Sequence, residues 1–169
     1  SLVLLQWAQD YFAGVGPSLV PSSAAQAARM RIIISRFDSG IVSAWYKLLR
    51  AKEEGEVASL LSDLSRELDW VEGQMDGKGP FLLGPNPTLA DAACAPWLLR
   101  KFVVQHWRGI DMLAGRPKLQ AWLEHYKSLP EVQATFQPPE GKSWEEAMKE
   151  GYAKYAEGVV LDFSKLQAK

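Results

Sequence analysis

Residues 79–100 read GPFLLGPNPTLADAACAPWLLR and combine a loop, a helix start and an apolar helix. The glycines and prolines of the first half predict a loop, with residues 81–83 turned toward a core. Thr88 and Asp91 have the spacing of a capping box, in which two residues at a helix start satisfy each other's backbone donors. The helix that follows is apolar on nearly all sides to about Trp107. This pattern predicts a central, buried helix.

A pair of long helices is predicted before this segment. The first begins at Ser22 or Ser23, either of which is a good N-cap, and runs through residues 24–54 with a bend at Gly40. The second covers residues 55–75, where apolar side chains form a stripe along one face. We expect these two helices to pack as an antiparallel hairpin.

Two further helices are predicted after the segment. Residues 117–129 begin with Pro117, and proline is favoured in the first turn of a helix. Ser143 and Glu146 form a second capping box, which starts a last helix ending near residue 157. No stretch alternates apolar and polar residues as a half-buried strand would. The predicted fold class is therefore all-α, a bundle of five or more helices.

The start of the chain reads as a separate unit. Residues 2–13 form a short amphipathic helix, and residues 14–23, GVGPSLVPSS, have the prolines and glycines of a linker. We place a domain boundary in this linker. The predicted units are residues 1–16, a terminal helix and the start of the linker, residues 17–157, the helical domain, and residues 158–169, a C-terminal tail.

Composition narrows the classes of function. The 169 residues, 47% of them hydrophobic, can bury one substantial core. Nineteen Lys and Arg against twenty Asp and Glu give a net charge of -1, which favours neither nucleic acid nor a membrane surface. The single Cys94, with His106 and His125, supplies neither a disulfide nor a metal cluster. We expect no membrane insertion, no metal, and a reducing compartment, cytoplasmic or soluble organellar.

The loop, cap and buried helix of residues 79–100 resemble the signature of the C-terminal domain of glutathione transferases. In that family the capping box of this helix is a folding element, and Thr88 and Asp91 stand at its positions. Residues 115–135 resemble the next helix of the family. Residues 34–49, ISRFDSGIVSAWYKLL, resemble the long first helix of the omega and lambda classes. The resemblance covers nearly the whole chain and implies a helical bundle like that domain.

The resemblance also implies that residues 1–16 end a truncated thioredoxin-like domain. In the family, a serine at the start of the last helix of that domain binds the γ-glutamyl carboxylate of glutathione, and Ser1 matches it. A helix N-terminus suits an anion. The acidic residue that precedes this serine in the family is absent from the sequence, and an arbitrary N-cap is the alternative interpretation of Ser1.

The catalytic cysteine and the cis-proline of the family lie upstream of Ser1, so the resemblance implies that this chain has no catalytic residue. Cys94 lies in an apolar helix, where burial raises the pKa of a thiol, and we interpret it as structural. Glutathione is expected as a co-substrate only when the missing half is present.

Omega-class positions, carried over one at a time, imply a substrate pocket for a small apolar or aromatic electrophile or ligand. Six residues are assigned to it: Phe37, Gly40, Ala44, Arg100, Trp144 and Tyr152. The guanidinium of Arg100 would bind a carboxylate or stack on an aromatic ring. Trp144 and Tyr152 would form an amphipathic lid. The alternatives are that Arg100 pairs with an acidic residue or with solvent, and that the two aromatic residues only pack the last helix onto the bundle.

Three functional hypotheses follow. The first is the helical substrate-binding half of an omega- or lambda-like glutathione transferase, a thiol transferase or reductase that is not catalytic alone. The second is a non-catalytic domain that docks or supports proteins in a larger assembly, and the third is a carrier of small ligands. A homodimer or another protein partner is compatible with each. The sequence upstream of Ser1 would distinguish the first two hypotheses.

Overall fold

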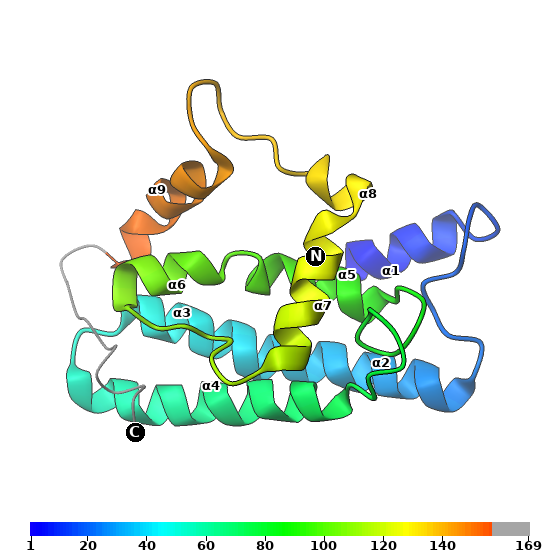
Figure 1. Cartoon of the computed structure of the whole chain (residues 1–169), viewed down its shortest axis with the longest axis horizontal. Coiled ribbons are helices and arrows are strands. Elements are labelled where there is room, and N and C mark those ends of the chain that lie inside the picture. The colour runs from blue at the N-terminus through cyan, green and yellow to red at the C-terminus, as the bar shows by residue number, and fades with distance from the viewer. Residues whose placement is uncertain (157–169) are drawn as a thin grey trace.

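The computed structural model describes residues 1–156 (Figure 1). In chain order its helices are α1 (Leu2–Tyr11), α2 (Ala24–Arg36), the π-helix η1 (Phe37–Val42), α3 (Ser43–Arg50), α4 (Glu54–Gln74), α5 (Leu89–Leu98), α6 (Lys101–Arg108), α7 (Pro117–Ser128), α8 (Pro130–Gln133) and α9 (Trp144–Ala156). Within residues 1–156, strand-like pairing is limited to one bridge between Phe81 and Gly84. The all-α prediction is confirmed. The predicted tail, 158–169, lies outside the described residues.

The predicted hairpin of long helices is confirmed. Figure 1 shows α2, η1 and α3 as one continuous column with α4 beside it. Ser23 is the N-cap of α2, and its hydroxyl accepts a hydrogen bond from the Gln26 N–H at 3.5 Å. At the predicted bend the backbone winds into the π-turn of η1. A Cβ atom on Gly40 would lie 2.8 Å from Cγ of Glu67, so glycine lets η1 approach α4 closely.

The central helix is α5, where Ala90, Ala95 and Leu98 have no exposed surface. The prediction of a single helix to Trp107 is wrong, because α5 ends at Leu98 and α6 starts at Lys101. Pro96 lies within α5, and the break follows two residues later, after Leu98. The chain turns at Arg100, whose N–H donates to the Trp97 carbonyl at 3.2 Å.

The predicted capping box at the start of α5 is present. The Thr88 N–H and hydroxyl donate to Asp91 Oδ2 at 2.7 and 2.8 Å. The other oxygen, Oδ1, accepts the Leu82 N–H at 2.9 Å and Nε1–H of Trp122 at 2.8 Å. Asp91 is fully buried, so one carboxylate joins the loop before α5, the start of α5 and α7.

Helix α1 lies beside the start of α5 and is fastened through the linker. The Leu19 N–H donates to Gln9 Oε1 at 2.9 Å, and the Leu89 N–H donates to the Leu19 carbonyl at 2.9 Å. None of the side chains of α1 is fully buried. Four large apolar side chains of α1 are more than half exposed: Val3, Leu4, Trp7 and Tyr11. The outer side of α1 is therefore an apolar surface, which we call the α1 face.

Helix α9 begins at the second predicted capping box, which is also observed. The Ser143 N–H and hydroxyl donate to Glu146 Oε2 at 2.8 and 2.7 Å, and the Glu146 N–H donates back to Ser143 Oγ at 3.2 Å. The hydrogen bonds from Ser143 lower the pKa of Glu146. Along its length α9 packs on α3 and α6, and Figure 1 shows the long loop that leads to it from α8.

Candidate functional site

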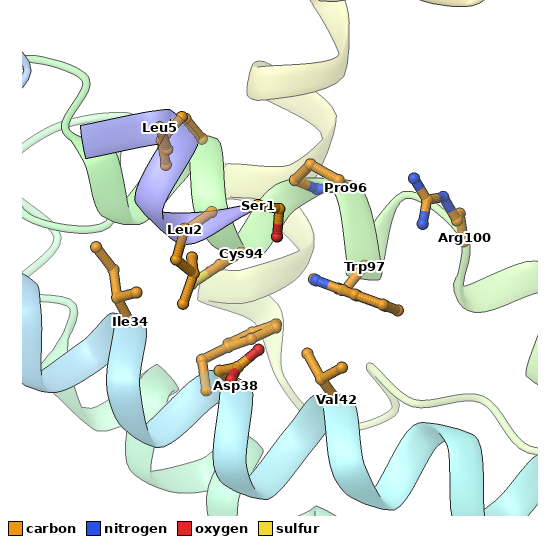
Figure 2. A pocket seen from close by; sticks show the side chains of 13 residues that line it. Ser1, Leu2, Leu5, Ile34, Asp38, Val42, Cys94, Pro96, Trp97 and Arg100 are labelled. Atoms are coloured by element: carbon orange, nitrogen blue, oxygen red, sulfur yellow. The ribbon is translucent and has the colours of Figure 1, made fainter. Parts of the chain in front are cut away.

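A cavity of about 290 Å³ lies between α1, the α2–η1 column and α5. We call it the Arg100 cavity. Its walls are mostly apolar, from Leu2 and Leu5 on one side to Pro96 on the other. Figure 2 shows the side chains of Ser1, Asp38 and Trp97 around a common space, with Arg100 at its edge. The polar groups therefore lie at separate points of an otherwise apolar cavity, as in a small-molecule site.

Local sequence explains this space. Ala92 and Ala93 line the cavity from α5, and their small side chains leave room that larger residues would fill. On the opposite wall, the π-turn of η1 closes from residue i to i+5, so that Phe37 and Val42 both line the cavity. Single π-turns within helices are frequent at functional sites.

Arg100 combines partial burial with few partners. Its Nη1 donates to the Tyr152 hydroxyl at 3.2 Å, and its Cζ lies 5.5 Å from the Trp97 ring centroid. Its Nε is buried and has no hydrogen-bond partner among residues 1–156. No carboxylate of the described residues forms a salt bridge with it, in contrast to the predicted alternative of an acidic partner. The guanidinium can therefore accept an anionic or aromatic ligand.

A second hollow, of about 450 Å³, lies on the other side of Pro96 and Arg100. Tyr126, Phe136 and Trp144 contribute its aromatic walls. Trp144 packs against Phe136 and Phe102, with ring centroids 4.6 and 5.3 Å away. Burial raises the pKa of Tyr126, so its hydroxyl stays protonated at neutral pH. Arg100 lines both hollows and separates them.

The predicted pocket is thus divided. Phe37 and Arg100 line the Arg100 cavity together, while Trp144 borders Arg100 only in the second hollow. Tyr152 lines neither space, although its hydroxyl accepts the hydrogen bond from Arg100. Its ring packs 4.8 Å from that of Trp45, which places it within an aromatic cluster under α9.

Gly40 and Ala44 depart from the prediction. They line a separate hollow of about 150 Å³ against α4, together with Lys47 and Glu67. The π-turn is the physical reason, because it returns Val42 rather than Gly40 to the side of Phe37. The Arg100 cavity therefore has no floor from Gly40 or Ala44.

Among the cavity residues that were not predicted from the sequence, Asp38 adds a charge and Trp97 an aromatic ring. Trp97 stands three residues before Arg100, a spacing that puts two side chains on the same helix face, and this signal was available. Asp38 lies with Ile34 and Phe37 at the spacing i, i+3, i+4, which is one face of a helix, so this signal was also available.

Cys94 also borders the cavity, but its side chain is 1% exposed. Burial, with a smaller effect of the nearby Asp91 carboxylate, raises the pKa of the Cys94 thiol well above its ordinary value. A protonated thiol is a poor nucleophile, which agrees with a structural role. Among the described residues, no three His, Cys, Asp or Glu side chains group as a metal site requires. None of the helices described is long and apolar enough to cross a membrane.

Comparison with known proteins identifies the protein family. Residues 43–125 match the family model of the glutathione S-transferase C-terminal domain. A probable glutathione transferase omega-2 of Caenorhabditis elegans is 26% identical over 142 residues, which are 76% of this chain and 55% of that protein. The chain therefore spans about half the length of this curated relative.

Solved structures agree in fold. Glutathione transferase Omega 3C of Trametes versicolor superposes with a TM-score of 0.76 at 25% identity, over 91% of this chain and 63% of that one. Maleylacetoacetate isomerase of Anaeromyxobacter dehalogenans was solved with dicarboxyethyl glutathione and citrate in its active site. It superposes with a TM-score of 0.65 at 26% identity, over 84% of this chain and 67% of that one. The chain belongs to the glutathione transferase family, of which it carries the C-terminal helical domain.

Proposed function

We propose that this chain is the helical substrate-binding half of an omega- or lambda-like glutathione transferase, active in thiol transfer or reduction only together with a thioredoxin-like half. The observation that carries the proposal is the Arg100 cavity, which borders both the first residue of α1 and a guanidinium that forms no salt bridge within residues 1–156. Omega-class proteins among its relatives support the class.

The α1 face supports the proposed position of the other half. Val3 is 80% exposed and Tyr11 68%, although both are large apolar residues. Contiguous apolar surface of this kind marks a contact with another protein surface. The proposed thioredoxin-like domain, of which residues 1–16 are the end, covers this face and adds the missing walls of the Arg100 cavity.

Glutathione is the proposed co-substrate, and its γ-glutamyl carboxylate is assigned to the start of α1. Ser1 is the N-cap residue there, and its hydroxyl makes no capping hydrogen bond, which leaves it available to a ligand. Free N–H groups of the first turn and the helix dipole favour an anion at this point.

The second substrate is proposed to be a small apolar or aromatic electrophile. The rings of Phe37 and Trp97 provide flat apolar walls, and Arg100 provides one cationic corner for a carboxylate or a ring. No residue of this chain is assigned as the nucleophile, which is the proposed contribution of the thioredoxin-like half.

The test is the protein in which the coding sequence upstream of Ser1 is joined to this chain. We expect glutathione-dependent reduction of a disulfide by the joined protein, and negligible turnover by the 169-residue chain. Arg100→Ala in the joined protein should raise the KM of an anionic aromatic substrate by about tenfold, with little change for a small neutral disulfide. Arg66→Ala, on the exposed side of α4, is the matched control.

Two results would contradict the proposal. One is turnover by the isolated chain that Cys94→Ser abolishes, since this would make Cys94 the nucleophile. The other is an upstream sequence without a thioredoxin-like domain, combined with specific capture of another protein by the α1 face. That combination would instead support the docking or structural module, because the same uncovered surface serves both functions.

A further inference from the structure

A hollow remote from the Arg100 cavity lies between α4 and the loop of residues 110–116. We call it the α4 groove. It has a volume of about 550 Å³, and it shares no lining residue with the Arg100 cavity. Small-molecule sites typically have roughly 300 to 1,000 Å³, so the α4 groove is of a suitable size.

The floor of the α4 groove is apolar and belongs to the core. Four of its lining residues are buried to 2% exposure or less: Leu64, Leu68, Ile110 and Met112. Ala58 and Ser62 line the rim from successive turns of α4, and both are exposed. Because these four side chains are almost completely covered by their neighbours, the apolar surface open to a ligand comes from Ala58, Leu61 and Ala114, which are exposed or partly exposed.

Arg116 holds the two walls in place. Its Nη1 donates to the Met112 and Ala114 carbonyls of the loop at 3.2 and 3.1 Å. Its Nη2 donates to Ser65 on α4, to the hydroxyl at 2.5 Å and to the carbonyl at 3.2 Å. The guanidinium thus spans from the loop to α4 and fixes their separation. Preformed walls reduce the ordering cost of binding.

The charges in the α4 groove select against ions. Asp69 Oδ1 lies 2.8 Å from Arg116 Nε, so the cation already has a carboxylate partner. Asp111 also lines the groove, and its carboxylate accepts the Leu113 N–H at 3.0 Å. An anionic ligand would compete with Asp69 for Arg116 and would be repelled by Asp111. A cationic ligand would be repelled by the guanidinium of Arg116. The groups that remain for a ligand are neutral hydroxyls, such as that of Ser62 at the rim.

We infer that the α4 groove is a second binding site, for an uncharged and mostly apolar small molecule about the size of a phenyl-substituted naphthalene. The Arg100 cavity, whose guanidinium has no carboxylate partner among residues 1–156, selects the opposite class of ligand, aromatic anions. The two sites are independent, and the inference does not rest on the proposed transferase function.

The test uses the neutral fluorescent probe N-phenyl-1-naphthylamine, titrated into the 169-residue chain. We expect saturable binding that Ser62→Trp weakens by about tenfold or more, because an indole on the rim fills the groove. Ser59→Trp is the matched control, because Ser59 is exposed on the same helix and lines no described cavity. The Ser59→Trp variant should bind the probe with the affinity of the wild type.

Arg100→Ala should also leave the affinity for the probe unchanged. Thermal unfolding by circular dichroism checks that each variant is folded, and Ala58→Trp replaces Ser62→Trp if that variant is not.

Each other result overturns the inference. Absence of saturable binding, or equal affinity of the Ser62→Trp and Ser59→Trp variants, removes the site. Loss of binding in Arg100→Ala places the probe in the Arg100 cavity. If sedimentation shows a dimer that Ser62→Trp dissociates without affecting the probe, the groove belongs to a second copy of the chain.

Discussion

Arg116 and Arg100 differ in what their guanidinium groups contact, although both are at least half-buried. Arg116 forms hydrogen bonds to three residues through Nη1 and Nη2 and holds a loop onto α4. Its buried Nε makes no hydrogen bond but lies 2.8 Å from Asp69 Oδ1, so its charge has an ion-pair partner. Arg100 has one hydrogen bond, to Tyr152, and a buried Nε without a partner among residues 1–156. The comparison separates two uses of a costly buried cation: satisfied groups hold the fold together, and unsatisfied ones are available to a ligand.

The largest effect should come from Asp91, whose buried carboxylate accepts four hydrogen bonds. Asp91→Ala leaves four buried donors without their acceptor, and we expect a loss of about 3 to 5 kcal/mol in the free energy of unfolding. Urea denaturation followed by circular dichroism measures it. The stability of the Asp91→Asn variant should lie between those of the wild type and Asp91→Ala. The control is Asp63→Ala, which removes an exposed ion pair on α4 and should change stability by less than about 0.5 kcal/mol. A loss no larger than that of Asp63→Ala would contradict the network.

Arg116→Ala should have the next largest effect. We expect a loss of about 2 kcal/mol in the free energy of unfolding, because the loop of residues 110–116 loses its hydrogen bonds to α4 and three carbonyls lose their donor. Arg116→Lys keeps the charge but cannot span the same acceptors, so it should recover only part of the loss. The same urea experiment with Arg66→Ala as control tests this. Equal stability of the Arg116→Ala and Arg66→Ala variants would show that Arg116 does not stabilise the fold.

Arg100→Ala should change stability by less than about 1 kcal/mol, because only one hydrogen bond is lost. Its effect should appear in binding. For the aromatic anion 1-naphthoate, we expect the affinity of the 169-residue chain to fall by about tenfold, measured by calorimetric titration. Trp97→Phe tests the wall of the Arg100 cavity and Trp144→Phe the second hollow, so the weaker of the two variants identifies the space that the anion occupies. An unchanged affinity in Arg100→Ala would show that its guanidinium is not a ligand group.

The smallest effect concerns pH. A hydrogen bond from Arg36 Nε at 2.5 Å lowers the pKa of Glu67 below its usual value of 4.5. Because the pKa is lower in the folded state, the ionised Glu67 stabilises the protein when the pH is above the usual pKa of the carboxyl group. This contribution is lost as the pH falls through the lowered pKa of the folded state. Because the Arg36 side chain is 38% exposed, we expect less than about 1 kcal/mol. The difference in unfolding free energy between wild type and Glu67→Gln should shrink between pH 7 and pH 3, and a constant difference would contradict the pair.

Features encoded by short-range spacing could be predicted from the sequence. Thr88 and Asp91, like Ser143 and Glu146, lie three residues apart, and their hydrogen bonds form within one helical turn. The second role of Asp91 could not be predicted in this way, since Leu82 and Trp122 reach it only through packing.

The candidate site was predicted in part for the same reason. Arg100 and Phe37 line the same cavity, whereas Gly40 faces α4. The π-turn changes which residues share a helix face, and no residue pattern in the sequence predicts a π-turn. The division of the predicted pocket at Arg100 follows from the break after Leu98, where an apolar run had indicated an unbroken helix.

The π-turn of η1 also fixes the rotational phase of the column that contains it. A π-turn holds one residue more than an α-turn, so α3 is rotated about the common axis by roughly 100° relative to an uninterrupted continuation of α2. Helix α2 packs on α5, while α3 packs on α4, α6 and α9. A deletion of one residue from η1 would straighten the backbone and yet turn the packed side of one of these two helices away from its partners, so the length of this segment is as constrained as its composition.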